Sequence, residues 1–200
     1  MLTPSSLGNG RRRVKIRESG MPDQKAWENF FDPEKILKTL GLGHRVNNVV
    51  EFGCGYGTFT IPTAKIIKGK IYALDIEPDM IRITKERARN NKLDNVEAIL
   101  CDFINDGSNL PNETADYAML FNILHLEQPG KLLNEARRVL KKDGKLGIIH
   151  WNCDPKTPRG PSMAIRPKPE QCIEWAKSAG FRSPKRFDLK PYHYGLLLVK

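Results

Sequence analysis

VVEFGCGYGTFT, at residues 49–60, is the stretch that decides how this chain folds. Its first four residues, apolar except for Glu51, are typical of a buried parallel strand. Glycines follow at Gly53, Gly55 and Gly57, and then an amphipathic segment begins. Glycine permits positive φ and lets a ligand approach the backbone, and the free N–H groups of the next helix favour an anionic group. The stretch therefore predicts a strand, a ligand-binding glycine turn and a helix.

The spacing of these glycines separates two classes of ligand. A dinucleotide fingerprint, G-x-G-x-x-G/A, needs a small residue three positions after its second glycine. Counted from Gly53 and Gly55, that position is Thr58, and the additional glycine is Gly57. The frame is Glu-x-Gly-x-Gly-x-Gly, which argues against an NAD-binding turn.

Outward from the turn, apolar periodicity predicts strands and helices in alternation. After the first strand, further strands are expected at residues 70–74, 95–100, 115–124 and 145–149, and two more in the closing segment 185–200. Helices are expected between them at residues 58–68, 79–91, 128–141 and 169–179. The link from Lys190 to Tyr192 is too short for a parallel crossover, so the last two strands should pair antiparallel. The pattern predicts an α/β fold with a doubly wound, mostly parallel sheet of seven strands that ends in an antiparallel hairpin.

The length of 200 residues and the 40% hydrophobic content suit one domain, expected at residues 21–200. Residues 1–20 are basic and rich in Ser and Gly, which predicts a disordered tail. Residues 21–44 should form one or two short helices, either a lid over the ligand or, as aromatic stripes more often are, part of the core at the sheet edge. Residues 152–168 form a long proline-rich loop, a type of segment that is often functional.

Composition limits the partners and the compartment. The net charge is +10, but much of the excess lies at residues 11–17, so a nucleic-acid partner is possible and not favoured. No apolar run is long enough to span a membrane, and the N-terminus lacks the apolar segment of a signal peptide. Scattered cysteines without a C-x-x-C pair argue against zinc and disulfides and favour a reducing cytoplasm. These are Cys54, Cys101, Cys153 and Cys172.

An acid follows the second strand at the position expected for a ribose contact. Asp75 lies 18 residues beyond Gly57, close to the spacing at which a carboxylate accepts from ribose hydroxyls. Ionised aspartate offers two acceptor oxygens to a vicinal diol. A plain helix N-cap is the simpler alternative, but the preceding strand, glycine turn and helix favour ribose binding. A second acid, Asp102, follows the third strand.

These features together resemble class I S-adenosylmethionine (SAM) dependent methyltransferases. Glu51 with its three glycines, Asp75, Asp102 and the terminal hairpin occur in the order of that family. The runs LDIEPDMI (74–81) and LHLEQPGKLLNEARRVLKKDGKL (124–146) resemble the type 11 subfamily, which includes quinone-biosynthesis enzymes and many small-molecule methyltransferases. The resemblance covers about residues 45–200 and implies SAM as cofactor.

The resemblance implies a role for each residue at the methionine end of the cofactor. Gly53, Gly55 and Gly57 would wrap the methionine moiety, with Tyr56 between them. Glu51 would reach the ammonium group, directly or through water.

It also implies the contacts of the nucleoside. Asp75 would hold the ribose and Ile76 would pack on the adenine. Asp102 would accept from the adenine amino group, and Phe103 would flank the ring or donate its backbone N–H to a ring nitrogen. Asn122 would lie near the sulfonium.

Because the methyl group of SAM is already activated, the protein must mainly align the acceptor, exclude water and remove a proton where the acceptor carries one. The candidate bases are His125 and His150 at strand ends, with His193 more remote. A strand-end histidine is as often part of a pocket wall, and that alternative stays open.

Two further groups are candidates for the acceptor pocket. Trp27, Tyr56 and Trp151 would give it apolar walls. Arg159 and Arg166, in the loop after the fifth strand, would clamp a carboxylate or phosphate, or simply be solvated.

The fourth strand ends in FNILH rather than the (N/D)-P-P-(Y/F) turn of amino-group methyltransferases, and no Pro-Cys pair supplies a cytosine-type nucleophile. We therefore expect methyl transfer to a small molecule. The alternatives are methylation of RNA or protein, and a non-catalytic SAM- or nucleotide-binding module.

Overall fold

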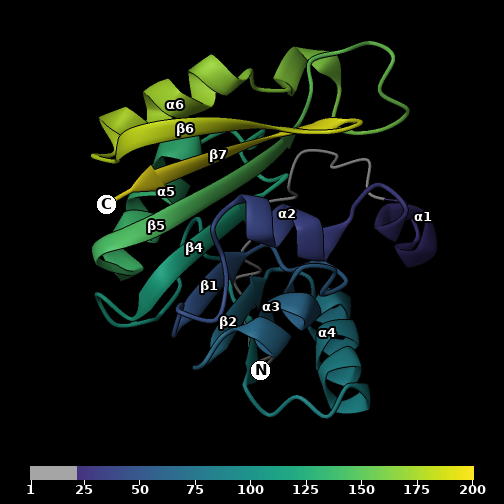
Figure 1. The fold of residues 1–200 in the computed structure, drawn as a ribbon, viewed down its shortest axis with the longest axis vertical. Helices are drawn as coiled ribbons and strands as arrows, with labels where there is room; N and C mark the ends of the chain where they lie inside the picture. Colours follow the sequence, from purple (N-terminus) through teal and green to yellow (C-terminus); the bar gives the residue numbers. More distant parts are fainter. Residues whose placement is uncertain (1–21) are drawn as a thin grey trace, which may run out of the picture.

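The structure, a computed structural model, describes residues 22–200, so the predicted basic tail lies outside the described residues. One seven-stranded sheet runs through the described part of the chain, with the order β3-β2-β1-β4-β5-β7-β6 (Figure 1). Its strands are β1 (Val49–Phe52), β2 (Ile71–Asp75), β3 (Val96–Leu100), β4 (Ala115–Phe121), β5 (Leu140–Trp151), β6 (Arg182–Leu189) and β7 (His193–Val199). Strands β1 to β5 are parallel, and β7 pairs antiparallel with both β5 and β6. The predicted doubly wound sheet with a terminal hairpin is confirmed.

Helices cover both faces of the sheet. They are α1 (Gln24–Glu28), α2 (Pro33–Thr39), α3 (Thr60–Ile66), α4 (Pro78–Asn90), α5 (Pro129–Val139) and α6 (Pro169–Ser178), with a short 3-10 helix at Met163–Ile165. Alternate side chains of β1 enter different cores: Val50 lies in the cluster with α5 and α6, and Val49 in the cluster with α2 and α3. Period-two alternation on a sheet buried on both faces produces this division. In the described part, no helix is both long and apolar enough to cross a membrane.

Several boundaries differ from the sequence-based expectations. The helix expected from Thr58 begins at Thr60, because the glycine turn continues to Phe59. The fourth strand ends at Phe121 rather than Leu124, because Asn122 adopts a positive φ of 55° and donates its backbone N–H to Ile149. Here the chain leaves the ladder at the carboxyl end of β4.

The fifth strand is much longer than residues 145–149. Helix α5 ends at Val139, and β5 begins at once with Leu140, which pairs with Ala115. At the other end His150 and Trp151 are still in the ladder, opposite Tyr194 and His193 of β7. The two residues expected after the strand are therefore held rigidly within it.

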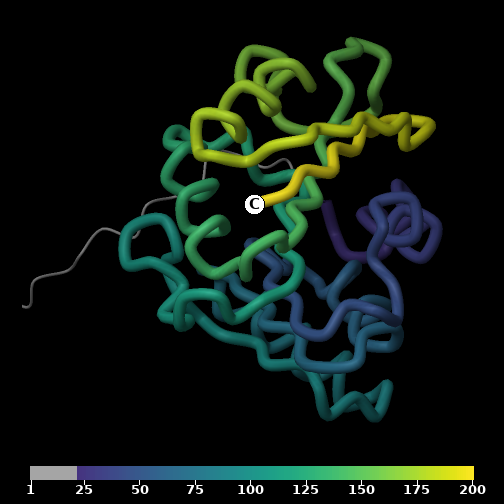
Figure 2. Tube along the Cα trace, turned by 60° about the vertical axis from the view of Figure 1, so that its left-hand side comes forward, coloured from purple at the N-terminus to yellow at the C-terminus, as the bar shows by residue number. Residues whose placement is uncertain are grey.

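The N-terminal helices pack on a sheet face and at its carboxyl edge. Helix α2 begins with Asp32 as its N-cap and Pro33 as its first residue, and its apolar stripe packs on the face of the sheet that holds Tyr117 and Ile149. Helix α1 lies beyond the carboxyl ends of the strands. Figures 1 and 2 place it on the same side of the molecule as the turn between β6 and β7, and the Phe30 ring lies 6.0 Å from the Tyr192 ring.

Candidate functional site

The glycine turn lies where the carboxyl ends of the central strands meet, and its backbone requires glycine. Gly53 and Gly57 have φ values of 78° and 73°. A Cβ atom on Gly53 would lie 2.8 Å from Cδ1 of Ile123, and one on Gly57 would lie 3.0 Å from Oγ1 of Thr84. The positive φ disfavours a side chain at both positions, and a Cβ atom would also crowd the side chain of Ile123 or Thr84. The turn presents bare backbone at the edge where ligands bind in doubly wound sheets.

Asp75, at the end of β2, holds this turn in place. Its Oδ2 accepts from the N–H of Gly55 at 2.8 Å, and its Oδ1 accepts from the N–H of Glu77 at 3.0 Å. Burial raises the pKa of Asp75, while these backbone hydrogen bonds lower it. Each oxygen of an ionised carboxylate accepts more than one hydrogen bond, so the side chain retains acceptor capacity beyond these backbone contacts.

Glu51 is a buried acid directly below the turn. Its side chain is 2% exposed, and Oε2 accepts from Thr60 Oγ1 at 2.5 Å. Burial raises the pKa of this carboxyl to about 8. In this state Glu51 therefore carries a proton at neutral pH, and an adjacent cation would favour its ionised form.

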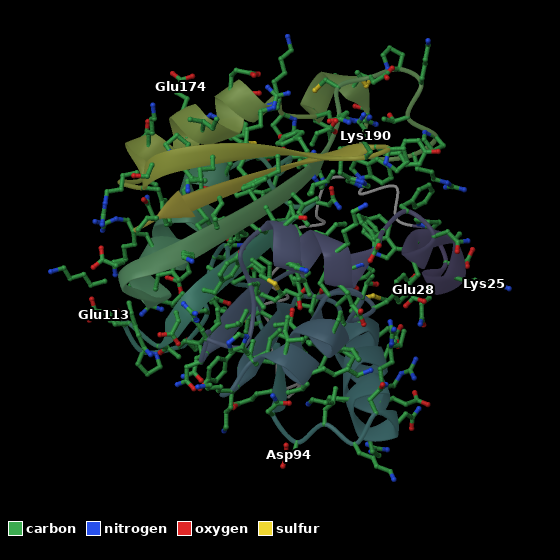
Figure 3. All side chains as sticks on the ribbon, in the orientation of Figure 1. Lys25, Glu28, Asp94, Glu113, Glu174 and Lys190 are labelled. Carbon is green, nitrogen blue, oxygen red and sulfur yellow. The ribbon has the colours of Figure 1, made fainter. Side chains whose placement is uncertain are left out.

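Side chains of helix α4 donate hydrogen bonds to the glycine turn, and one of them also pairs with helix α1. Thr84 donates to the carbonyl of Gly55 at 3.0 Å, and Arg87 donates to the carbonyl of Tyr56 at 2.6 Å. The same Nη1 atom of Arg87 lies 2.6 Å from Oε1 of Glu28, a residue of α1 that Figure 3 labels. Sequence reasoning missed Thr60, Thr84 and Arg87, because a lone Thr or Arg on a helix carries no motif.

The end of β3 is arranged differently from expectation. Asp102 accepts from the N–H groups of Ile104 and Asn105 and thus caps its own turn. The Phe103 ring is 4% exposed and packs edge-on against Phe52 in the core, with 5.4 Å between centroids. The predicted flanking of a bound ring by the Phe103 side chain is therefore wrong, because burial in the core takes the phenyl ring away from the site. Ile76, next to Asp75, stays partly exposed.

Asn122 is the polar residue that follows β4. Its φ of 55° is left-handed, a conformation that Asn tolerates better than most residues. Both polar atoms of its side chain are buried, with no hydrogen-bond partner within residues 22–200. Buried amide atoms are normally paired, so this side chain is available to a bound molecule. Thr58 Oγ1, buried in the glycine turn, has the same property in the described part.

The structure brings three histidines together. His125 Nδ1 lies 3.3 Å from His150 Nε2, and His193 joins them from β7. The sequence interpretation had placed His193 farther away, because antiparallel pairing of β7 with β5 cannot be read residue by residue from sequence. Burial lowers the pKa of His150 well below its usual value and the pKa of His193 to about 3. Both rings are therefore neutral at pH 7 and act as hydrogen-bonding groups of low basicity.

An aromatic group joins α1 to the histidines. Trp27 and Phe30 lie 6.3 and 5.3 Å, centroid to centroid, from the Trp151 ring. The His193 ring lies 4.2 Å from Trp151 and 4.6 Å from Phe31. The N-terminal aromatic face thus packs on the carboxyl end of β5. Of the predicted apolar walls, Trp27 and Trp151 are brought together, whereas Tyr56 donates its hydroxyl to Pro22 at 3.1 Å.

Arg166 has a structural role in the loop after β5. Its guanidinium donates to the carbonyls of Asn152, Arg159 and Pro161 and to the hydroxyl of Thr157. The side chain is buried, so these bonds use the donors that a carboxylate clamp would need. The predicted clamp is wrong for Arg166, and so is the alternative of a solvated arginine.

Comparison with known proteins gives a family and a fold. The family described as "Methyltransferase domain" matches residues 44–179. A SAM-dependent methyltransferase from Aquifex aeolicus has a similar structure, with a TM-score of 0.78 and 29% identity over 88% of this chain and 93% of that one.

Curated proteins with related sequences act on different acceptors. The 2-methyl-6-phytyl-1,4-hydroquinone methyltransferase of Arabidopsis thaliana is 29% identical over 80% of this chain and 48% of its own length. A 23S rRNA (uracil(1939)-C(5))-methyltransferase of Alcanivorax borkumensis is 28% identical over 56% of this chain and 24% of its own. The chain thus spans half or less of the length of these two relatives.

Proposed function

The chain belongs to the methyltransferase domain family, and from this premise we propose that it transfers the methyl group of SAM to a small-molecule acceptor. The observation that carries the proposal is the arrangement of Glu51, the glycine turn and Asp75 at the carboxyl ends of two adjacent parallel strands. Phe52 of β1 is paired with Leu74 of β2, so the residues that follow them lie side by side.

The methionine end of SAM fits the turn. A carboxylate would approach the bare backbone of Gly53, Gly55 and Gly57, where a Cβ atom would be blocked at two of the three positions. The ammonium group would lie toward Glu51. Because Glu51 is protonated in this state, we propose that the ammonium displaces its proton and forms a charge-assisted hydrogen bond.

The nucleoside would follow along the ends of β2 and β3. Asp75 keeps acceptor capacity for the two ribose hydroxyls while it still holds Gly55. Ile76 is partly exposed and offers an apolar surface for the adenine. At the end of β3, Asp102 remains the proposed acceptor for the adenine amino group. For Phe103, we propose only that its backbone N–H donates to a nitrogen of the adenine ring.

The reaction centre would lie beside Asn122, at the end of β4. Its unpartnered amide would contact the cofactor near the sulfonium or orient the acceptor. His150, which is neutral because burial lowers its pKa, would accept a hydrogen bond from an acceptor hydroxyl, together with His125 beside it. Since burial makes His150 a weak base, we propose that the pair positions the acceptor and takes a proton only as the acceptor becomes acidic during transfer.

Bound SAM supplies an electrophilic methyl group on a sulfonium that leaves as a neutral thioether. The contribution of this chain is alignment and exclusion of water. Trp27 and Phe30 pack with Trp151 over the carboxyl edge, and Arg87 ties α1 to the turn. This arrangement suits an apolar acceptor, and the relative that acts on a hydroquinone supports that class.

We further propose that residues 21–200 act as one domain in the cytoplasm, with residues 21–44 covering the site and residues 152–168 on the acceptor side. The buried arginine that ties this second segment together supports a fixed loop rather than a flexible one. RNA is the alternative acceptor, supported by a relative that modifies 23S rRNA.

The test is transfer of label from methyl-labelled SAM into a cell extract divided into small-metabolite, RNA and protein fractions. The proposal predicts label in the small-metabolite fraction, and loss of that label in an Asp75→Asn variant. Label in RNA alone would replace the small-molecule acceptor by the alternative. Absence of transfer to every fraction, with no SAM binding, would refute the proposal.

A further inference from the structure

A basic hollow lies at the end of the sheet opposite the glycine turn. Its volume is about 550 Å³, and its walls are the end of α2, the segment 41–46 and the amino ends of β4 and β5. Glu113, labelled in Figure 3, marks this end of the sheet, and Figure 1 shows β5 running from here toward the side of α1. Neither the methyl-transfer proposal nor the family assignment gives this hollow a role.

The charges that face the hollow are strongly unequal. Five cations and two acids line it, together with His44. Asp116 is paired with Lys141 at 2.9 Å, and Asp143 is paired with Arg182 of β6. Both acids are therefore neutralised by salt bridges.

Four cations of the hollow are unpaired among residues 22–200: Lys38, Arg45, Lys142 and Lys145. All four side chains are exposed. Lys38 lies in the last turn of α2, where a cation complements the helix dipole. The other three lie in a loop or on β5, so they have no helix dipole to complement. Four cations from three separate segments converge on one concavity.

The lining selects among anionic ligands. None of its described residues is Phe, Tyr or Trp, so a ligand here would be held through its phosphates and not through stacking of its bases. A flat membrane surface does not reach into a concave site. A phosphodiester backbone needs only cations at intervals along its path, which is what this surface offers.

We propose that the hollow binds the phosphate backbone of a single-stranded RNA, without regard to sequence. The site would act as an anchor. Lys145 and Trp151 are six residues apart on β5, which at about 3.3 Å per residue is roughly 20 Å. The RNA would therefore bind well away from the cofactor edge. The proposal does not rest on methyl transfer, because the binding is measured without SAM.

The experiment is fluorescence anisotropy with a labelled 20-nucleotide single-stranded RNA and the full chain, at NaCl from 50 to 300 mM. The test variant replaces the four unpaired cations by Gln, which keeps side-chain length and removes charge: Lys38→Gln, Arg45→Gln, Lys142→Gln and Lys145→Gln. We expect affinity at least tenfold weaker at 50 mM NaCl. The slope of log K against log salt should become less negative by about 3, since each phosphate contact to a single strand contributes about 0.7.

The control variant removes the same charge elsewhere, from four exposed lysines on α4, α5, α6 and β6: Lys85→Gln, Lys131→Gln, Lys177→Gln and Lys185→Gln. It should bind within twofold of the wild type, and both variants should melt like the wild type. Equal weakening in both variants would assign binding to net charge and overturn the proposal. The proposal would also be overturned if the four residues were required for binding of ATP or of phosphatidylserine vesicles but not for binding of RNA.

Discussion

Arg87 on α4 holds Glu28 on α1, with 2.6 Å between Nη1 and Oε1, while the same nitrogen donates to the carbonyl of Tyr56. One guanidinium thus connects the N-terminal helix to the glycine turn. Any movement of α1 that opens the cofactor edge must break this pair.

The first prediction concerns this connection. Glu28→Gln removes the charge and should speed SAM dissociation about two- to fivefold, since a partly exposed ion pair contributes about 0.5–1 kcal/mol. Stopped-flow fluorescence measures the rate, with Trp27 of α1 as a nearby reporter. The control is Glu86→Gln, which breaks an exposed ion pair between Glu86 and Arg82, both of them on α4. Equal dissociation rates in wild type and Glu28→Gln would show that α1 does not gate exchange.

Glycine at position 57 is required by conformation as well as by space. Gly57→Ala should destabilise the fold by about 1–2 kcal/mol, because a left-handed backbone is unfavourable for Ala. For a chain of this size that lowers Tm by about 2–8 °C. Gly130→Ala is the matched control, since nothing lies within 4 Å of its Cβ and it occupies a helix. Scanning calorimetry that finds the two variants alike would contradict the assigned turn.

SAM binding should release a proton from Glu51. Burial raises the pKa of this carboxyl to about 8, so it is mostly protonated at pH 7 without ligand. A bound ammonium favours the ionised form, and nearly one proton per SAM should be released. Titration calorimetry at pH 7 in buffers of different ionisation enthalpy measures this number. Glu51→Gln should abolish the release, and an unchanged release in that variant would exclude Glu51 as its source.

Buried neutral histidines should make the fold sensitive to acid. The pKa of His193 is lowered by burial to about 3, so below the unfolded value of about 6.5 the unfolded chain binds a proton that the native state excludes. The contribution of neutral His193 to the free energy of unfolding is fully present above pH 6.5. Below that pH it falls by up to about 1.4 kcal/mol per pH unit. His193→Gln should make the decline between pH 6.5 and 4.5 shallower by about that slope in urea unfolding. His44→Gln, at an exposed site, should leave it unchanged. Parallel curves for all three proteins would refute this assignment.

The sequence predicted the fold well because two periodicities and the glycine frame are local signals. β1 begins and ends at the residues that the apolar run marks. The length of β5 was missed, because Lys141 and Lys142 look like a helix end. They lie in the irregular stretch of β5 between Leu140 and Lys145, the residues that pair with β4.

The site was predictable where one residue type implies one chemistry. Asp75 follows β2 and contacts the glycine turn, although its hydrogen bond to Gly55 has no sequence signal. Phe103 could not be placed, because an aromatic residue after a strand serves a pocket or a core equally well. Arg166 was misjudged because the loop carbonyls that it binds are brought together only by the fold.

Titration calorimetry with SAM, comparing wild type with Asp75→Asn, tests the central claim most directly. The account predicts saturable binding at one site per chain in the wild type. Asp75→Asn should bind at least tenfold more weakly, since hydrogen bonds to a charged group contribute about 1.5–3 kcal/mol. Asn keeps one acceptor oxygen, which can serve the N–H of Gly55, while the contact with the N–H of Glu77 is lost. Absence of saturable binding in the wild type, or equal affinity in the variant, would contradict the assignment of this turn and this acid to the cofactor.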